Sequence, residues 1–409
     1  MLPRRHVHPE GHWSLGFPTV LKQGVACGPL IFIAGQVDLS RDGKMLNPGD
    51  LMAQTRASMT HVGAILDGYG ADFGDLVKLT VFYVSDGTVD ETDLLEEIAA
   101  ALGTLPGPGP VITAIPVPAL AFDGMMVEIE GIAMRDQNGP RLPRAAAWSP
   151  DGPVLPRAFS QALRCGAMIF SSGVTAADDV GGVQDPGSLA AQSRLVLPKI
   201  DRLLRQLGAG LGDSVKTNVF NVEPGKQEEW KEAALIRGSF YPEPGPAATG
   251  IPVPALWPAG VMVKNDVIAM RAPDGSRLPR RAVWPTGHWD WPVHLPYRHG
   301  LQCGDLVFLG GQVSLRPDGS VIDPGDMAAQ THTAMANIER VLAELGLTFD
   351  HVVKINTFYV GGASVEDLRR NAEIRAGCFR EPGPASTGVP MPYLAYEDMV
   401  IEIDVVAML

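Results

Sequence analysis

The stretch GQVDLSRDGKMLNPGDLMAQT at residues 35–55 returns almost unchanged as GQVSLRPDGSVIDPGDMAAQT at residues 311–331. A third, more divergent copy lies between them, because Cys27, Cys165 and Cys303 follow one another at a constant step of 138 residues. A repeat of this length is a whole domain rather than one unit of a solenoid. The sequence therefore predicts three tandem copies of one domain, with the function at the surfaces where the copies meet.

The repeat divides the 409-residue chain into three predicted domains at residues 1–140, 141–276 and 277–409, of which the middle one is degenerate. Each copy is long enough to bury a core of its own. The joints between copies, at residues 135–148 and 271–284, are short, charged and rich in turn residues. We therefore expect neighbouring copies to pack tightly against one another rather than to swing freely.

The chain is acidic, with a formal net charge of −13, and it has no stripe of basic residues. Proteins that bind nucleic acids need such a stripe to neutralise phosphates, so no nucleic-acid partner is expected. No window approaches the roughly 20 apolar residues of a membrane span, and the N-terminus has no apolar signal core. Three of the four cysteines share one repeat position, which argues against disulfides. These features favour a cytoplasmic protein with no membrane partner.

Copy three gives the clearest order of secondary structure. Apolar residues recur at steps of three and four from Met327 to Leu345, which predicts a helix with one buried face. The whole expected order is β-β-α-β-α-β-β, at residues 299–303, 306–309, 327–345, 352–360, 366–379, 387–391 and 399–407. This order predicts an α+β fold in which both helices cover one face of a mixed sheet. We expect the neighbouring copies to cover the other face.

Copy two departs from the other copies in three ways. Pro198 falls inside its first predicted helix, where it removes a backbone donor and should kink or split the helix. Val174 stands where the other copies have Gln36 and Gln312, and copy two contains no histidine. The three clefts between copies are therefore expected to differ chemically.

Six short motifs recur in the same order in the copies and are sharpest in copy three. They lie at residues 296–304, 306–312, 324–331, 352–359, 381–387 and 401–407. Each motif is weak alone, but six in order, three times over, make a strong signal. Through these motifs the chain resembles the RidA/YjgF family, also called the endoribonuclease L-PSP family, once per copy along its whole length.

The resemblance implies a chorismate-mutase-like α+β domain and a homotrimer-like arrangement within one chain. In such a pseudo-trimer the sheets line a central barrel and the ligand clefts lie between neighbouring copies. Members of the family hydrolyse reactive enamines and imines to keto acids and ammonia, and relatives include 2-aminomuconate deaminases. The resemblance therefore implies a small-molecule substrate and no cofactor, while further self-association of the pseudo-trimer is left open.

One residue that the resemblance implies is missing. In deaminating members an Arg before the next-to-last strand holds the substrate carboxylate, and its place aligns with Ser386, Ala248 and Ile112. Arg237 and Arg375 share one position on the second helix and could replace it, but we expect them to face solvent. Ser386 remains a candidate substrate-binding residue. The position after it is a candidate oxygen-binding hydroxyl in every copy, unless it only bonds its own sheet: Thr113, Thr249 and Thr387.

The candidate catalytic residues are acids on the last strand, which in the family position the attacking water. They align with Glu130, Asp266 and Asp404, and the alternative is an ordinary barrel-lining or salt-bridged acid. Two residues earlier on the same strand face, the copies have Glu128, Lys264 and Glu402.

Further candidates come from copy three and from the histidines. Tyr297 and Asn371 match cleft residues of the family and mark copy three as the best equipped, unless they only pack. His6, His8 and His12 include a His-X-His pair that could bind zinc with a third His, but no nearby Cys or HExxH pattern supports such a site, so no metal is expected. His12-Trp13 and His288-Trp289 recur in register, which favours a role in anchoring the arm that precedes the first predicted strand.

Two functions remain open from the sequence. The first is a RidA-like hydrolase or deaminase that acts on an enamine, imine or related C–N bond at a cleft between copies, without the usual Arg. The alternative is a non-catalytic small-molecule-binding or interaction protein on the same scaffold. A ribonuclease is a weaker third hypothesis, because the acidic charge opposes it.

Overall fold

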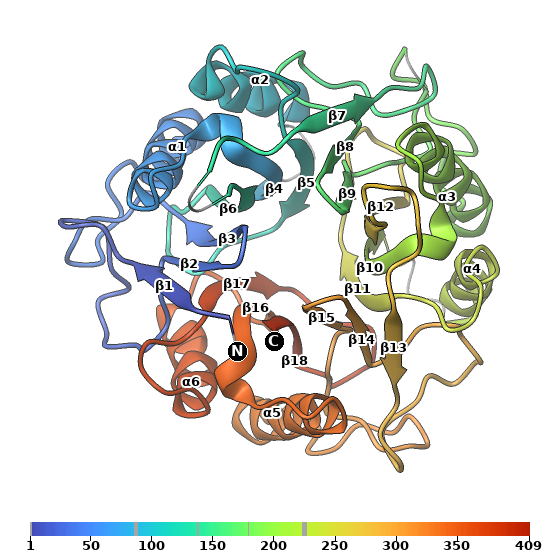
Figure 1. The fold of residues 1–409 in the computed structure, drawn as a ribbon. Helices are drawn as coiled ribbons and strands as arrows, with labels where there is room; N and C mark the ends of the chain where they lie inside the picture. The colour runs from blue at the N-terminus through green and yellow to red at the C-terminus, as the bar shows by residue number, and fades with distance from the viewer. Residues whose placement is uncertain (1, 86–88, 137–138, 179, 223–226) are drawn as a thin grey trace.

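A computed structural model describes residues 2–85, 89–136, 139–178, 180–222 and 227–409. Three similar α+β units surround a common axis, with their strands inside and their helices outside (Figure 1). The chain ends meet near this axis, where the Leu2 amide donates to the Leu409 carbonyl at 2.8 Å. Among the described residues, no helix is long and apolar enough to cross a membrane.

Domain 1 contains one six-stranded sheet and two helices. Its elements are β1 (Arg4–Val7), β2 (Gly24–Cys27), β3 (Leu30–Gln36), α1 (Leu51–Asp67), β4 (Leu76–Val84), α2 (Glu91–Leu102), β5 (Val111–Val117) and β6 (Val127–Met134). The strand order is β1-β2-β3-β6-β4-β5, and only the β4–β5 pair is parallel.

Domains 2 and 3 repeat this plan. Domain 2 has β7 (Arg144–Ala147), β8 (Ala162–Cys165), β9 (Met168–Ser171), α3 (Leu189–Gln206), β10 (Ser214–Val222), α4 (Gln227–Gly238), β11 (Ala247–Val253) and β12 (Val263–Met270). Domain 3 has β13 (Arg280–Val283), β14 (Gly300–Cys303), β15 (Leu306–Leu309), α5 (Met327–Glu344), β16 (Val352–Val360), α6 (Val365–Gly377), β17 (Ala385–Met391) and β18 (Ile401–Met408). The predicted α+β fold of three tandem copies is confirmed.

Each domain also has a leading strand that the sequence did not predict. The strands β1, β7 and β13 begin at the repeated Leu-Pro-Arg pieces, and the Arg of each piece reaches a carbonyl of another domain. Arg4 donates to Val352, Arg144 to Leu76 and Arg280 to Gly212, at 3.0, 2.7 and 2.6 Å. The arginines of these basic pieces therefore link each domain to a neighbouring domain.

A buried glutamine fixes the first helix in each copy. In domain 1 the Gln54 amide donates to the carbonyls of Asn47 and Gly124, at 2.6 and 2.7 Å, and accepts from the Met126 amide at 2.7 Å. The helix begins one turn earlier, at the N-cap Asp50. Gln192 and Gln330 make the same contacts in the other copies. This clamp explains why the Pro-Gly-Asp…Gln-Thr stretch recurs.

The helix that contains Pro198 is not split. It runs from Leu189 to Gln206 as α3, and its apolar face is buried along its length.

The domains share a core around the axis and exchange arms at the rim. The inner faces of all three sheets contribute to one cluster, which includes Cys27, Cys165 and Cys303. The arm before β2 packs on the core of domain 3, the arm before β8 on domain 1, and the arm before β14 on domain 2. The sheets themselves stay separate and meet in part through single bridges such as Lys22–Ala385.

Candidate functional site in the clefts between domains

A cleft lies at each junction between domains. One wall of every cleft is the arm, the hairpin and the last strand of one domain, and the opposite wall is the second helix and next-to-last strand of its neighbour. We call the clefts 1 (domains 1 and 3), 2 (domains 1 and 2) and 3 (domains 2 and 3). Their volumes are about 350, 480 and 80 Å3.

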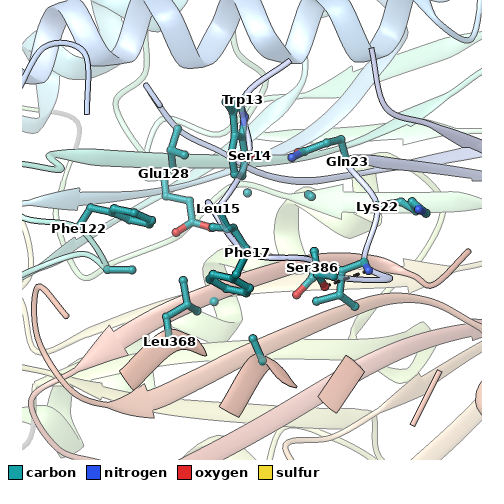
Figure 2. Close-up of a pocket in the computed structure, with 18 of the residues that line it drawn as sticks. Trp13, Ser14, Leu15, Phe17, Lys22, Gln23, Phe122, Glu128, Leu368 and Ser386 are labelled. Carbon is teal, nitrogen blue, oxygen red and sulfur yellow. Dashed lines mark hydrogen bonds between the residues drawn. The ribbon is translucent and has the colours of Figure 1, made fainter. Parts of the chain in front are cut away.

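Cleft 1 combines an acid and a guanidinium with an apolar wall. Glu128 comes from β6 of domain 1, while Arg375 and Ser386 come from α6 and β17 of domain 3. Aromatic side chains, among them Phe17 and Phe122, complete the lining (Figure 2).

The Glu128 carboxyl group is buried on the floor of cleft 1. Burial, and to a smaller extent the nearby Glu130 charge, raises its pKa from 4.5 to about 8, although Lys354 and the Gly388 backbone amide act against this rise. A Cβ atom on Gly35 would lie 1.7 Å from the Glu128 carboxylate, which explains the glycine at the head of the GQV motif. At neutral pH the group is therefore mostly a neutral acid that can donate a proton.

Arg375 faces the cleft, so the expectation that it points to solvent was wrong. Its side chain is buried, with 1% of the residue exposed. Nε and Nη2 donate to Asn371 Oδ1 at 3.0 and 2.8 Å, and Nη1 lies 3.3 Å from Ser386 Oγ. Burial lowers its pKa to about 10, so the guanidinium stays charged at neutral pH.

The physical reason for this burial is the arm exchange. Leu15, Val20 and Leu21 of domain 1 pack against the core of domain 3 and cover the region of α6 that an isolated domain would leave open. The recurrence of Arg237 and Arg375 at the repeat step was the available sequence signal.

Cleft 3 repeats the acid and the guanidinium in a smaller space. Burial, helped by Asp404, raises the pKa of Glu402 to about 8. Arg237 is also buried rather than solvated, and its Nη1 donates to Ser193 Oγ at 2.8 Å. The cleft is narrow because Trp291 and Tyr297 line it, where cleft 1 has the smaller Leu15 and Leu21 in register.

Cleft 2 carries the opposite arrangement of charge. Lys264 stands in the register of Glu128, and Glu91 of α2 lies opposite it. Lys264 Nζ lies 2.8 Å from both Glu91 carboxylate oxygens and donates to the Ala114 carbonyl at 2.7 Å. The Tyr83 hydroxyl also donates to Glu91, at 3.0 Å. Lys264 and Glu91 of cleft 2 thus neutralise each other.

The predicted catalytic acids lie nearer the axis, each in an ion pair with a lysine of the neighbouring domain. The Nζ–carboxylate distances are 2.8 Å for Lys78–Asp266, 3.0 Å for Lys216–Asp404 and 2.7 Å for Lys354–Glu130. The predicted hydroxyls complete these pairs, because Thr113, Thr249 and Thr387 donate to the same three acids at 2.9, 2.8 and 2.6 Å. The acids line a central space of about 60 Å3, whereas Glu128 and Glu402 line the clefts.

The remaining predicted site residues are divided between two clefts. Tyr297 lines cleft 3 beside Arg237, whereas Asn371 orients Arg375 at cleft 1, where Ser386 also lies. Both residues belong to copy three, but a cleft is built from two copies, so they do not form one site.

His12 and His288 anchor the arms, as the sequence predicts. His12 Nε2 lies 2.9 Å and Trp13 Nε1 3.0 Å from the buried Gln36 Oε1, and domain 3 repeats this with His288, Trp289 and Gln312. Burial lowers the pKa of His12 and of His288 to about 4, so both imidazoles are neutral at pH 7. In the described part of the chain, no group of three His, Cys, Asp or Glu residues is placed to hold a metal.

The fold and the clefts define a class of proteins in which three α+β domains enclose small-molecule-sized clefts at their junctions. The chain belongs to the Endoribonuclease L-PSP family, whose pattern matches residues 19–135, 153–271 and 291–409.

Single-domain relatives match one copy at a time. The chain is 32% identical over 126 residues to the RutC family protein YjgH of Escherichia coli, which covers 30% of this chain and 92% of YjgH. It is 34% identical over 114 residues to Protein DfrA of Myxococcus xanthus, and this match covers 27% of this chain and 84% of DfrA. A solved chorismatase covers 82% of this chain and 93% of its own at a TM-score of 0.54, but with 14% identity it shows the fold alone.

Proposed function

We propose that the chain is a small-molecule hydrolase that acts in cleft 1 on a carboxylate-bearing imine or enamine. The observation that carries the proposal is that one cleft of about 350 Å3 is lined both by the buried, mostly neutral Glu128 and by the buried, charged Arg375. A volume of this size suits a small organic ligand.

Arg375 would hold the substrate carboxylate. Its Nη1 reaches to 3.3 Å from Ser386 Oγ, so the helix delivers a guanidinium to the strand position where the family resemblance expects an Arg. Asn371 fixes the orientation of the guanidinium through two of its nitrogens. A planar, oriented guanidinium binds a carboxylate through two parallel hydrogen bonds, which a lysine cannot reproduce.

Glu128 would move the protons. The neutral carboxyl group protonates the imine nitrogen, and its conjugate base then takes a proton from the water that adds to the C=N carbon. The tetrahedral adduct loses ammonia and leaves a keto acid, so that imine and water are consumed and keto acid and ammonia are formed. A pKa near the working pH lets one group serve as acid and then as base.

The test is ammonia release from 2-imino acids generated in place by an amino-acid oxidase. We expect the wild-type chain to accelerate release, and Glu128→Gln and Arg375→Met each to lose roughly 100-fold or more of this acceleration. The matched controls are Glu402→Gln and Arg237→Met in cleft 3, which should retain it. Full activity in folded Glu128→Gln would contradict the assignment of cleft 1.

The alternative is a binding protein without turnover. It is favoured by the alignment of Ser386, Ala248 and Ile112 with the place of the Arg in deaminating members. Calorimetric titration with a stable keto acid separates the two functions. Binding that Arg375→Met abolishes, in a protein that releases no ammonia from any imine, would support the binding protein.

A further inference from the structure

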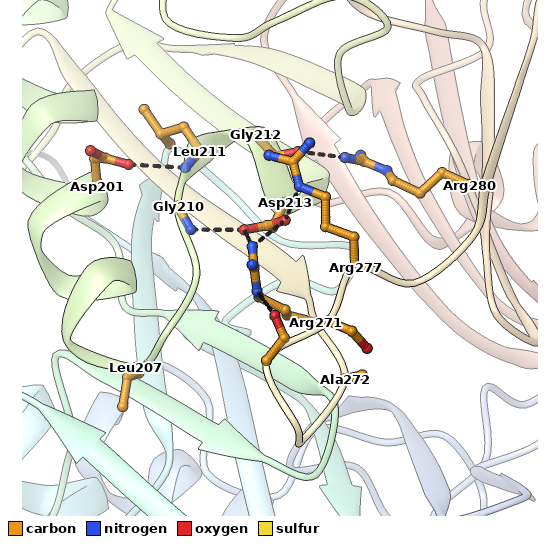
Figure 3. A network of polar contacts seen from close by, with 12 residues as sticks. Asp201, Leu207, Gly210, Leu211, Gly212, Asp213, Arg271, Ala272, Arg277 and Arg280 are labelled. Carbon is orange, nitrogen blue, oxygen red and sulfur yellow. Dashed lines mark hydrogen bonds and ion pairs between the residues drawn. The ribbon is translucent and has the colours of Figure 1, made fainter.

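A separate arginine-lined hollow lies at the joint of domains 2 and 3, away from the clefts. It has a volume of about 470 Å3 and is lined by Arg205, Arg271, Arg277 and the loop at residues 208–213. Asp213 is buried at its base, where Arg271 Nη1 donates to both carboxylate oxygens at 3.2 and 3.0 Å (Figure 3).

We call this hollow the domain 2 corner, and the equivalent region of domain 1 the domain 1 corner. In the domain 1 corner the charged groups are paired with one another. Asp75, the counterpart of Asp213, pairs with Arg135 at 3.0 Å and with Arg141 at 2.9 Å. Asp72 binds the terminal nitrogen of the same guanidinium, because Arg141 Nη2 donates to both Asp72 carboxylate oxygens at 2.7 Å. Arg141 is therefore held, with 28% of its side chain exposed.

In domain 2 the second carboxylate is gone. Gly210 stands in the register of Asp72, although the backbone is the same, with φ −156° and ψ −179° against −141° and −178°. Arg277, the counterpart of Arg141, keeps only a 3.6 Å contact between its Nε and Asp213 and has 72% of its side chain exposed. Within the described ranges, its terminal nitrogens make no hydrogen bond.

A second substitution between the copies makes the domain 2 corner still more positive. Arg205 stands where domain 1 has Asp67. Its Nε donates to Asp201 at 2.6 Å, which leaves both terminal nitrogens without a hydrogen bond to any residue that the structure describes. The domain 1 corner thus has three carboxylates and two guanidinium groups, a net charge of −1. The domain 2 corner has two carboxylates (Asp201 and Asp213) and three guanidinium groups, a net charge of +1.

We propose that the domain 2 corner is a binding site for a small oxyanion with two or more negative charges, such as the phosphoryl or diphosphoryl group of a small metabolite. Arg277 and Arg205 bind its oxygens, and Arg271, held by Asp213, adds positive charge at the base. Two guanidinium groups with open terminal nitrogens match the oxygens and charge of a phosphoryl group. The acidic chain as a whole repels a polyanion such as a nucleic acid, so the ligand is small.

The test is calorimetric titration of the full chain with inorganic pyrophosphate, against sodium chloride at equal ionic strength. We expect saturable binding of one pyrophosphate per chain. Arg277→Gln should weaken it about tenfold or more, because a charge-assisted pair of hydrogen bonds is lost. Arg375→Met, in cleft 1, should leave it unchanged, which keeps this test independent of the proposed activity.

The sharpest variant is Gly210→Asp, which restores the carboxylate of domain 1 on a backbone that already has the required conformation. It should capture Arg277 as Asp72 captures Arg141 and abolish pyrophosphate binding, although its Cβ atom would lie 3.2 Å from Asp201 Oδ1, so that carboxylate must shift in the folded variant. No saturable binding to the wild-type chain, or equal binding to wild type and to folded Gly210→Asp, would overturn the proposal.

Discussion

Lys264 Nζ lies 2.8 Å from both carboxylate oxygens of Glu91, and this buried pair reverses the charge pattern of the other two clefts. In clefts 1 and 3 the sheet supplies an acid and the neighbouring helix an arginine, whereas in cleft 2 the sheet supplies a lysine and the helix an acid. Lys264, the cation of cleft 2, is thus already paired with the Glu91 carboxylate. A fused chain can carry such a difference, because the three copies no longer share one sequence.

Removing one member of this pair should destabilise the protein. Among the described residues, Lys264→Met leaves the buried Glu91 charge with the Tyr83 hydroxyl as its one remaining side-chain partner, and such an uncompensated charge costs about 3–5 kcal/mol. We expect the midpoint of thermal unfolding to fall clearly. The double variant Lys264→Met, Glu91→Gln should recover much of the loss. Equal midpoints for wild type and Lys264→Met would show that the pair does not hold the junction together.

The acids near the axis should affect stability more than turnover. Asp404→Asn removes the partner of the buried Lys216 Nζ, which lies 3.0 Å away, so we expect a loss of about 3–5 kcal/mol and a lower unfolding midpoint. Any ammonia release measured below that midpoint should stay near the wild-type rate, since Asp404 does not line cleft 1. A folded Asp404→Asn without turnover would instead support the catalytic role that the sequence predicts for this acid.

The narrow cleft 3 should accept a larger ligand once its aromatic residues are reduced. Trp291→Leu with Tyr297→Leu gives this cleft the residues that cleft 1 has at the same register positions. Calorimetry with phenylpyruvate, a carboxylate with an aromatic body, should then report two binding equivalents per chain instead of one. Adding Arg237→Met should return the value to one. A single equivalent in the folded double variant would mean that these side chains do not set the size limit.

Most of the fold follows from local patterns. The apolar periodicity from Met327 predicts α5, observed as Met327–Glu344, and the β-branched run predicts β16 at its observed bounds, Val352–Val360. The leading strand β13 was missed because its four residues have a half-exposed pattern and pair only at the edge of the sheet. Such a strand has little apolar periodicity of its own to detect.

The clefts were harder to predict, because their chemistry depends on contacts between copies. Glu128 and Glu130 share one face of β6, so alternation along the strand cannot distinguish the residue that lines the cleft from the one that pairs with Lys354. The burial of Arg375 depends on an arm more than 350 residues earlier in the chain, at Leu15 to Leu21. Neither effect leaves a trace in the local sequence of one copy.

The pKa of Glu128 predicts a specific dependence of stability on pH. Because its pKa is about 8 in the folded chain and 4.5 is its ordinary value, the folded state binds more protons than the unfolded state between these pH values. Stability should therefore fall as pH rises from 4.5 to 8, with each pH unit costing about 1.4 kcal/mol per group. Glu128→Gln should remove this pH-dependent contribution to stability, so its unfolding midpoint should exceed that of wild type at pH 8 and match it at pH 4.5.

A constant difference in midpoint across this pH range would mean that Glu128 is already ionised in the folded chain. Glu402→Gln, the matched change in cleft 3, should behave in the same way, because the carboxyl group there is raised to about 8 by the same burial.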